Sequence, residues 1–179
     1  MQMTVEGGVG VRGSDGKVMW KDAHVASKTA NVNTPNFVNN KVIYTYDFGS
    51  SVLLLNAHDG VVTAKELYFT QDLPVDQGGV VMVNGYLYGF SSAVLNCVDL
   101  PTGKRVWRDR SVGSGSLIYA DGRLYLLSAS FTVGLVSSSP SAMAGPAASI
   151  EPPLPGTWFT VSYSRTVLKS HRIDPSLVE

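Results

Sequence analysis

The sequence predicts an all-β fold built from short, repeated strands. Two kinds of turn motif recur along residues 1–137, and each comes before a run rich in β-branched or aromatic side chains. No long stretch of the chain carries apolar residues at the i, i+3, i+4, i+7 spacing of an amphipathic helix. Most of this region is therefore expected to form strands joined by tight turns.

A glycine-centred motif is the first repeat. The run Asp15–Trp20 (DGKVMW) returns at 59–64 (DGVVTA) and again at Thr102–Trp107 (TGKRVW). Its glycine recurs 44 residues after the first copy and 43 residues after the second. Because one four-stranded blade of a β-propeller takes roughly 40–45 residues, this period predicts a propeller with one motif per blade.

Turn-forming pairs are the second repeat. Asn39-Asn40, Asn84-Gly85 and Asp121-Gly122 each stand before a β-branched or aromatic run. Asn, Asp and Gly tolerate the positive φ that both central residues of a type I′ turn adopt. These pairs therefore predict β-hairpins rather than helix starts.

Strands are expected between these turns. They span residues 5–12, 17–21, 41–48, 51–56, 61–68, 79–83, 86–91, 93–99, 104–109, 115–120, 123–129 and 132–137. The repeats divide this region into a partial blade at 1–22, blades at 23–66 and 67–109, and a partial blade at 110–137. The sequence thus predicts a β-propeller of about three to four four-stranded antiparallel blades. Closed propellers have roughly four to eight blades, so an incomplete ring is expected.

The last quarter of the chain follows a different pattern. Residues 138–156 are rich in Pro, Ser and Ala and carry one charge, which is typical of a linker or a long exposed loop. The tail at 157–179 contains one expected strand, at 158–164, where apolar and polar side chains alternate. Two interpretations of the tail stay open: it completes a blade, or the sequence leaves the repeat there through truncation or a shifted reading frame.

The third copy of the glycine motif resembles a known repeat. Cys97–Trp107 (CVDLPTGKRVW) is similar to the A-x-D-x-x-T-G-x-x-x-W repeat of pyrroloquinoline-quinone-type (PQQ-like) β-propellers, with Cys97 in the alanine position. The resemblance covers roughly residues 9–137 and implies a PQQ-like propeller fold. Members of this family often work outside the cytoplasm, and they include both enzymes and non-enzymes, so the repeat says little about chemistry.

The other two copies depart from the family pattern. Gly10–Trp20 keeps the glycine and the tryptophan but has Arg12 in the aspartate position. The copy at 54–64 is degenerate, with Asn56 in the aspartate position and Ala64 in the tryptophan position. The second blade is therefore expected to lack the motif's large aromatic side chain.

The motif has a physical explanation that is independent of the family. An Asp or Thr favours a turn, the following Gly adopts the left-handed conformation, and the Trp four residues later offers a large surface that a neighbouring blade covers. Trp20 and Trp107 are therefore expected to pack between blades. The residues expected to build this structural motif are Asp15, Gly16, Trp20, Asp59, Gly60, Asp99, Thr102, Gly103 and Trp107.

Composition excludes several classes of function. The chain carries 14 basic and 14 acidic side chains, so it lacks the positive charge that is typical of nucleic-acid-binding proteins. A single cysteine excludes an intrachain disulfide and a zinc site built from cysteines. No apolar run approaches the roughly 18 residues of a membrane span. Residues 1–7 show neither the basic nor the apolar region of a signal peptide, so none is expected.

The sequence shows no constellation of residues for catalysis or metal binding. His24, His58 and His171 are too scattered for a ligand pair, and His58 is expected to face solvent beside a turn. Cys97 is expected to be a buried structural thiol. The glycine-rich run 113–116 is expected to be a bend, because it does not open a helix that could cradle a phosphate.

Two functions follow from these observations. The first is a non-catalytic binding or assembly platform, which the resemblance to the outer-membrane barrel-assembly lipoprotein implies, with a protein partner or a second copy held at exposed blade edges. The alternative is a fragment of a quinone-dependent alcohol or sugar dehydrogenase, for which the resemblance implies PQQ and calcium as cofactors. Asp47, Asp76 and Asp99 are the available carboxylates, yet none lies in a catalytic motif. The missing catalytic motifs favour the platform.

Overall fold

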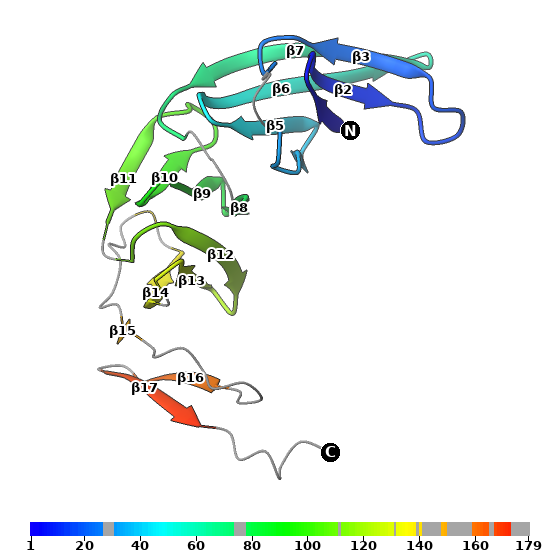
Figure 1. The fold of residues 1–179 in the computed structure, drawn as a ribbon. Helices are drawn as coiled ribbons and strands as arrows, with labels where there is room; N and C mark the ends of the chain where they lie inside the picture. Colours follow the sequence, from blue (N-terminus) through cyan, green and yellow to red (C-terminus); the bar gives the residue numbers. More distant parts are fainter. Residues whose placement is uncertain are drawn as a thin grey trace.

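The computed structural model describes residues 1–26, 31–73, 78–110, 112–130, 132–138, 140, 148–149, 159–164 and 167–172, with side chains as far as residue 140. All regular secondary structure in these residues is β-strand, arranged in antiparallel sheets (Figure 1). The all-β prediction is therefore confirmed.

The strands group into sheets that follow the order of the chain. The strands are β1 (Gln2–Thr4), β2 (Gly7–Val11), β3 (Val18–Asp22), β4 (Asn36–Val38), β5 (Lys41–Tyr46), β6 (Gly49–His58), β7 (Val61–Thr70), β8 (Val80–Val83), β9 (Tyr86–Ser91), β10 (Val94–Asp99), β11 (Arg105–Asp109), β12 (Gly115–Ala120), β13 (Arg123–Ser128), β14 (Thr132–Ser137), β15 (Ala148–Ser149), β16 (Phe159–Ser164) and β17 (Val167–Arg172). The first sheet has three strands, β1-β2-β3, and three four-stranded sheets follow, β4 to β7, β8 to β11 and β12 to β15. Strands β16 and β17 pair as a separate hairpin.

The first four sheets form a partial propeller. Each is an up-and-down meander in which consecutive strands pair antiparallel. In Figure 1 these sheets lie along a curved row, from the blue strands near the N-terminus to the yellow-green β12 to β14. Four-stranded meanders arranged side by side around a curve are the blades of a propeller. The predicted fold class is thus observed in the described part of the chain.

Four strands were not expected from the sequence. Strands β1, β4 and β15 have three, three and two residues, which is too short for an apolar-polar alternation to stand out. Strand β17 lies in the tail, where only one strand was expected, and it pairs with β16. Most of the expected linker at 138–156 lies outside the described residues, as do 157–158, 165–166 and 173–179 of the tail.

The type I′ turns are confirmed. Both central residues have positive φ in Asn39-Asn40 (45° and 59°), in Asn84-Gly85 (49° and 83°) and in Asp121-Gly122 (49° and 72°). Asp59-Gly60, between β6 and β7, has the same conformation, with φ of 48° and 76°. The second copy of the glycine motif is therefore a two-residue hairpin, the turn that best matches the right-handed twist of its strands.

Buried side chains lie between neighbouring sheets, in one cluster per interface. The first and second sheets share Met3, Trp20, Val25, Val42, Tyr44, Tyr46 and Leu53. The second and third share Ile43, Val52, Leu73, Leu87, Val98 and Leu100. The third and fourth share Val83, Tyr88, Phe90, Leu95, Cys97, Val112, Leu117, Leu124, Leu126 and Val136.

Strands in the middle of the row are apolar on both faces. In β5, Val42 and Tyr44 pack toward the first sheet, while Ile43 packs toward the third. In β9, Leu87 packs toward the second sheet and Tyr88 toward the fourth. Successive side chains on a strand point to opposite faces, so a sheet covered on both sides needs apolar residues at nearly every position.

One aromatic side chain occupies an equivalent place in each of the first three sheets. In each of these three sheets, the pairing of the last two strands is interrupted by a β-bulge. The aromatic residue on the last strand pairs with the residue that comes immediately before the bulge on the neighbouring strand. These pairs are Trp20 with Gly10, Tyr68 with Val52, and Trp107 with Cys97. The expectation that Ala64 marks the aromatic position of the second copy is therefore wrong, because Tyr68 fills that position.

A longer hairpin explains the displacement. Val52 and Tyr68 are 16 positions apart, whereas Cys97 and Trp107 are 10 apart, so the second sheet has six extra residues between equivalent positions. These residues lengthen β6 and β7 to 10 residues each and move the turn outward. The end of this longer hairpin, residues 55–64, lies against the first sheet, where Val62 and Ala64 pack on the cluster around Trp20.

Candidate functional site

The two ends of the sheets carry different loops. In an up-and-down meander the turns alternate between ends, so the last strand of one sheet ends, and the first strand of the next begins, at the end opposite the glycine-motif turn of the same sheet. We call this the connection end. The end that carries the glycine-motif turn we call the motif end. Between neighbouring sheets the two ends can touch, because the Asp72 carboxylate just after β7 accepts a hydrogen bond from the Arg105 amide beside the motif turn of the third sheet at 3.2 Å.

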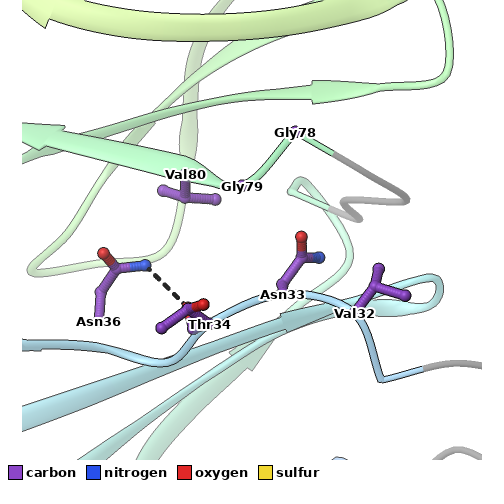
Figure 2. Close-up of a pocket in the computed structure, with 7 residues that line it drawn as sticks. All are labelled: Val32, Asn33, Thr34, Asn36, Gly78, Gly79 and Val80. Atoms are coloured by element: carbon purple, nitrogen blue, oxygen red, sulfur yellow. Dashed lines mark hydrogen bonds between the residues drawn. The ribbon is translucent and has the colours of Figure 1, made fainter.

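A pocket of about 450 Å³ lies at the connection end, between the second and third sheets. Figure 2 shows the segment that leads into β4 on one side and the start of β8 on the other. Asn33 is only 7% exposed, and its Nδ2 donates to the Thr45 carbonyl oxygen at 3.2 Å, which fixes this segment on β5. Asn36 Nδ2 lies 3.4 Å from the Thr34 carbonyl oxygen (Figure 2). The lining residues are Val32, Asn33, Thr34, Asn36, Gly78, Gly79 and Val80.

A second pocket, of about 460 Å³, lies beside it between the third and fourth sheets. Its lining residues are Gly78, Phe90, Ser92, Ser114, Gly115, Ser116, Leu127, Ser128 and Ala129. The Ala129 amide donates to the Ser114 carbonyl oxygen at 2.8 Å, which joins the β13–β14 turn to the segment before β12. Both pockets have Gly78 in their lining, so they lie next to each other, and we call the pair the connection-end groove.

Glycine is required where the two pockets meet. Gly78 and Gly79 have φ of 89° and 70°, a backbone conformation that residues other than Gly, Asn and Asp rarely adopt. A Cβ at Gly78 would lie 2.8 Å from the Gly115 carbonyl oxygen, so the backbone before β8 approaches the fourth sheet closely. A Cβ at Gly115 would lie 2.0 Å from the carbonyl oxygen of Leu127, on the paired strand β13 of the same sheet.

The described residues that line the connection-end groove are uncharged. They offer amides, hydroxyls and main-chain groups. The ionisable groups with clearly shifted pKa values lie elsewhere, between the sheets. There, burial raises the pKa of Tyr68 to about 12 and that of Cys97 to about 11, and it also raises the pKa of Tyr44 and Tyr88. The described lining can therefore form hydrogen bonds, and none of its side chains is ionisable near neutral pH.

The motif residues lie at the motif end, away from this groove. In the third copy, Asp99 Oδ2 accepts a hydrogen bond from the Thr102 amide at 3.1 Å and another from the Thr102 hydroxyl. The Gly103 amide donates to the Asp99 carbonyl oxygen at 2.8 Å, and the Asp99 amide donates to the Lys104 carbonyl oxygen at 2.9 Å. Asp99 thus closes its own turn, a structural role.

The first copy keeps the backbone bonds of this turn and changes the side chains. The Gly16 amide donates to the Arg12 carbonyl oxygen at 2.9 Å, and the Arg12 amide donates to the Lys17 carbonyl oxygen at 2.8 Å. Asp15 replaces the missing aspartate by accepting from the Lys17 amide at 3.0 Å and from the Arg12 guanidinium at 3.2 Å. The loop therefore tolerates arginine in the aspartate position.

The candidate carboxylates are not brought together. Asp47 lies in the β5–β6 turn at the connection end, whereas Asp99 lies at the motif end of the next sheet. Asp76 lies outside the described residues. Asp47 and Asp99 therefore cannot share one ion or one substrate atom.

An unexpected polar cluster joins the first two sheets. His24 Nδ1 lies 2.6 Å from Glu66 Oε2, which also accepts a hydrogen bond from the Ser51 hydroxyl at 2.9 Å. Ser51 is fully buried and bonds to the carboxylate rather than to the imidazole, so the three residues do not form a nucleophilic triad. His58 and Asp59, by contrast, form an exposed pair at a turn, and the side chain of His171 lies outside the description.

Cys97 is fully buried and lies between Tyr88 and Trp107 on neighbouring strands. Burial raises the pKa of its thiol to about 11; a hydrogen bond with Tyr88 opposes this rise, and Asp99 adds to it.

At pH 8 only about one Cys97 thiol in 10³ would be ionised, and the thiolate is the reactive form. We therefore expect iodoacetamide to label native protein at least about 100-fold more slowly than urea-unfolded protein. The labelling of both forms is followed by mass spectrometry. Equal rates for the native and the unfolded protein would contradict the burial of Cys97.

The groove residues were not singled out by sequence motifs. The run 113–116, expected only to form a bend, leads into β12, and Ser114–Ser116 line the second pocket. Gly78-Gly79 at the start of the expected strand 79–83 is the available signal, because glycine at a strand marks a close backbone approach. Asn33 has no local signature at all.

The described residues contain neither a metal-binding cluster nor a membrane-spanning helix. No group of three or more of their His, Cys, Asp and Glu side chains is placed to bind a metal ion. No helix with the length and apolar character of a membrane span occurs in that same part of the chain.

Similarity of this chain to known proteins is found among solved structures. No family model matches the chain, and no curated protein matches it. Among solved structures, the chain is similar to BamB from Moraxella catarrhalis, with 10% sequence identity and a TM-score of 0.42. The match covers 88% of this chain and 58% of that BamB chain, so this chain spans less than two thirds of that protein.

Proposed function

We propose that this chain is a non-catalytic propeller module of the PQQ-like repeat class that binds a partner protein, as a binding or assembly platform. The observation that supports this proposal is the connection-end groove, which lies along three consecutive sheets and whose described lining residues include none of His, Lys, Arg, Asp or Glu. Serine catalysis needs an adjacent base, and the described lining supplies none. Such a groove favours binding through hydrogen bonds and apolar contacts.

The groove does not fit the cofactors of the alternative function. The resemblance implies a quinone held by basic and polar side chains, and Ca²⁺ takes roughly six to eight oxygen ligands that usually include carboxylates. Among the residues that the structure describes, the lining of the groove offers neither a basic side chain nor a carboxylate.

A thermal shift experiment tests the choice between platform and dehydrogenase. Adding PQQ together with Ca²⁺ is expected to leave Tm unchanged to within about 1 °C, because a ligand raises Tm only if it binds the folded state. The matched control is Ca²⁺ alone. A saturable rise of several degrees, together with dye-linked alcohol oxidation, would contradict the platform and favour the dehydrogenase fragment.

The partner of the platform is either a different protein or a second copy of this chain. Both would use exposed blade edges, since unpaired edge strands readily add another strand. Solution mass by light scattering separates the two cases: a monomer favours a different protein, and a defined oligomer favours a second copy.

A further inference from the structure

We propose that a pocket at the motif end of the first and second sheets holds a bulky apolar side chain of a partner protein that stands next to a carboxylate. This inference rests on the proposed binding function and adds a contact surface separate from the connection-end groove. The pocket has a volume of about 360 Å³, and its lining comes mainly from β2, β3 and the end of the long β6–β7 hairpin. We call it the motif-end pocket.

Two departures from the repeat pattern meet at this pocket. Arg12, which takes the aspartate position of the first copy, lines it, and so do Ala57 and residues 60–62. The latter belong to the hairpin that has six extra residues. Strand β7 runs beside β3, so the end of this hairpin lies against the first sheet (Figure 1). Departures from a repeat are expected where function constrains the sequence, so their convergence on one place favours a binding role there.

The motif-end pocket leaves apolar surface exposed. Val11 and Val61 in its lining are 48% and 60% exposed, whereas Trp20, which also lines it, is 8% exposed. Exposed apolar side chains that gather in one place mark interaction sites, and burying them is favourable. A small ligand needs roughly 70–90% of its surface buried, which walls this exposed do not provide. An apolar side chain of a partner protein takes the rest of its cover from the partner itself.

Arg12 gives the motif-end pocket a positive charge. It is the only charged side chain in the described lining, and it is 41% exposed. Its Nη1 lies 3.2 Å from Asp15 Oδ2, and its Nη2 lies 3.5 Å from the Sδ of Met19, another lining residue. A guanidinium has five N–H donors, so these contacts leave donors for a carboxylate of the partner. Because Asp15 offsets part of the charge and the site is exposed, the carboxylate is expected to strengthen binding only about two- to fivefold.

The probe is a library of N-acetylated, C-amidated hexapeptides in which Leu, Met or Phe is followed by Asp, with a matched library that has Asn in place of Asp. Binding to the full chain is measured by amide chemical shifts and by fluorescence polarisation. Saturable binding with shifts at Gly10, Gly60 and Val61 is expected. The Asp peptides are expected to bind about two- to fivefold more tightly than the Asn peptides at roughly 0.05 M salt and about equally at roughly 0.5 M salt, because salt screens exposed ion pairs.

A pair of charge variants tests the role of Arg12. Arg12→Gln is expected to bind the Asp and Asn peptides about equally, because the cation that distinguishes them is gone. The matched control, Lys17→Gln, removes an exposed cation of the same turn that is not in the described lining, and it is expected to keep the preference for Asp. A preference for Asp that persists in Arg12→Gln would overturn the proposed recognition of the carboxylate.

Filling variants locate the apolar contact. Ala57→Trp and Val11→Trp fill the motif-end pocket from two exposed positions of its lining. Each is expected to weaken peptide binding at least about tenfold. The matched control, Thr63→Trp, places the same side chain on an exposed position of β7 that is not in the described lining, and it is expected to leave the affinity unchanged. Two filling variants keep the test decisive if one of them fails to fold.

Three other results would overturn the inference. Peptide binding that survives both filling variants would exclude the motif-end pocket and leave the proposed platform function intact. Binding of octanoate to this pocket with no peptide binding would replace the partner protein with a small carboxylic acid. Absence of all binding to a folded chain whose Tm does not respond to PQQ with Ca²⁺ would reject the pocket alone, whereas a saturable rise of Tm with that cofactor would count against the platform function itself.

Discussion

Replacing Trp20 with alanine is expected to lower the free energy of unfolding by about 3–5 kcal/mol. Trp20 is 8% exposed and lies in the cluster shared by the first and second sheets, with its ring edge-on to Tyr44 at 6.2 Å between centroids. The indole fills its space closely, since a Cβ at Gly10 would lie 2.1 Å from Trp20 Nε1. The first sheet has only three strands and is covered by this cluster, so removing the indole leaves a cavity at its main contact with the rest of the chain.

Urea unfolding followed by circular dichroism measures this loss. Val18→Ala is the matched control, because it shortens an apolar side chain on the same strand that is 46% exposed. Substitutions at such positions usually change the free energy of unfolding by less than about 1 kcal/mol. Equal losses in the two variants would show that the first sheet is not held by Trp20. The transition must also be two-state for the comparison to hold.

Turns were the part of the fold that sequence could predict. At Asn84-Gly85 and Asp121-Gly122 the residue types themselves allow positive φ, so the signal is contained in two neighbouring residues. Strand position then follows from the turn, which is why β9 and β13 begin immediately after these pairs, at Tyr86 and Arg123. Local chemistry is sufficient here, because no partner strand has to be known.

Register across strands was not predictable in the same way. The sequence pointed to Ala64 because it lies four residues after Gly60, the spacing found in the other copies. The extra residues of the β6–β7 hairpin break that spacing, and only the pairing of Val52 with Tyr68 shows which residue occupies the aromatic position. Register depends on contacts between strands, which a count of residues from the turn does not contain.

The groove lies beyond the reach of motif analysis for a related reason. Asn33, Gly78 and Ser114 come from three separate connections, and no motif marks them as a set. Asn33 and Gly78 line the first pocket, and Gly78 and Ser114 line the second, because each connection joins neighbouring sheets at the same end. Their spacings are 45 and 36 residues, and the second departs from the repeat period of 43–44 residues, so a count of residues does not bring these positions together.

Tyr68 gives the second large effect. Tyr68→Ala is expected to lower the free energy of unfolding by about 2–4 kcal/mol, because the ring packs between the second and third sheets and contacts Gly103 of the next motif turn. Tyr68→Phe is expected to cost only about 1 kcal/mol, since it removes the hydroxyl that donates to the Leu100 carbonyl oxygen but keeps the ring.

Urea titrations of Tyr68→Ala, Tyr68→Phe and Thr63→Ala measure these differences together. Thr63 is exposed on the same strand, so its truncation is expected to change stability by less than about 0.5 kcal/mol. A larger loss for Tyr68→Ala than for Tyr68→Phe, with the threonine variant near wild type, would show that Tyr68 takes the tryptophan's place in the second blade. If Tyr68→Ala costs no more than Thr63→Ala, the equivalence drawn from the bulge fails, and the contact between the second and third sheets depends on the other members of its cluster, such as Ile43 and Leu87.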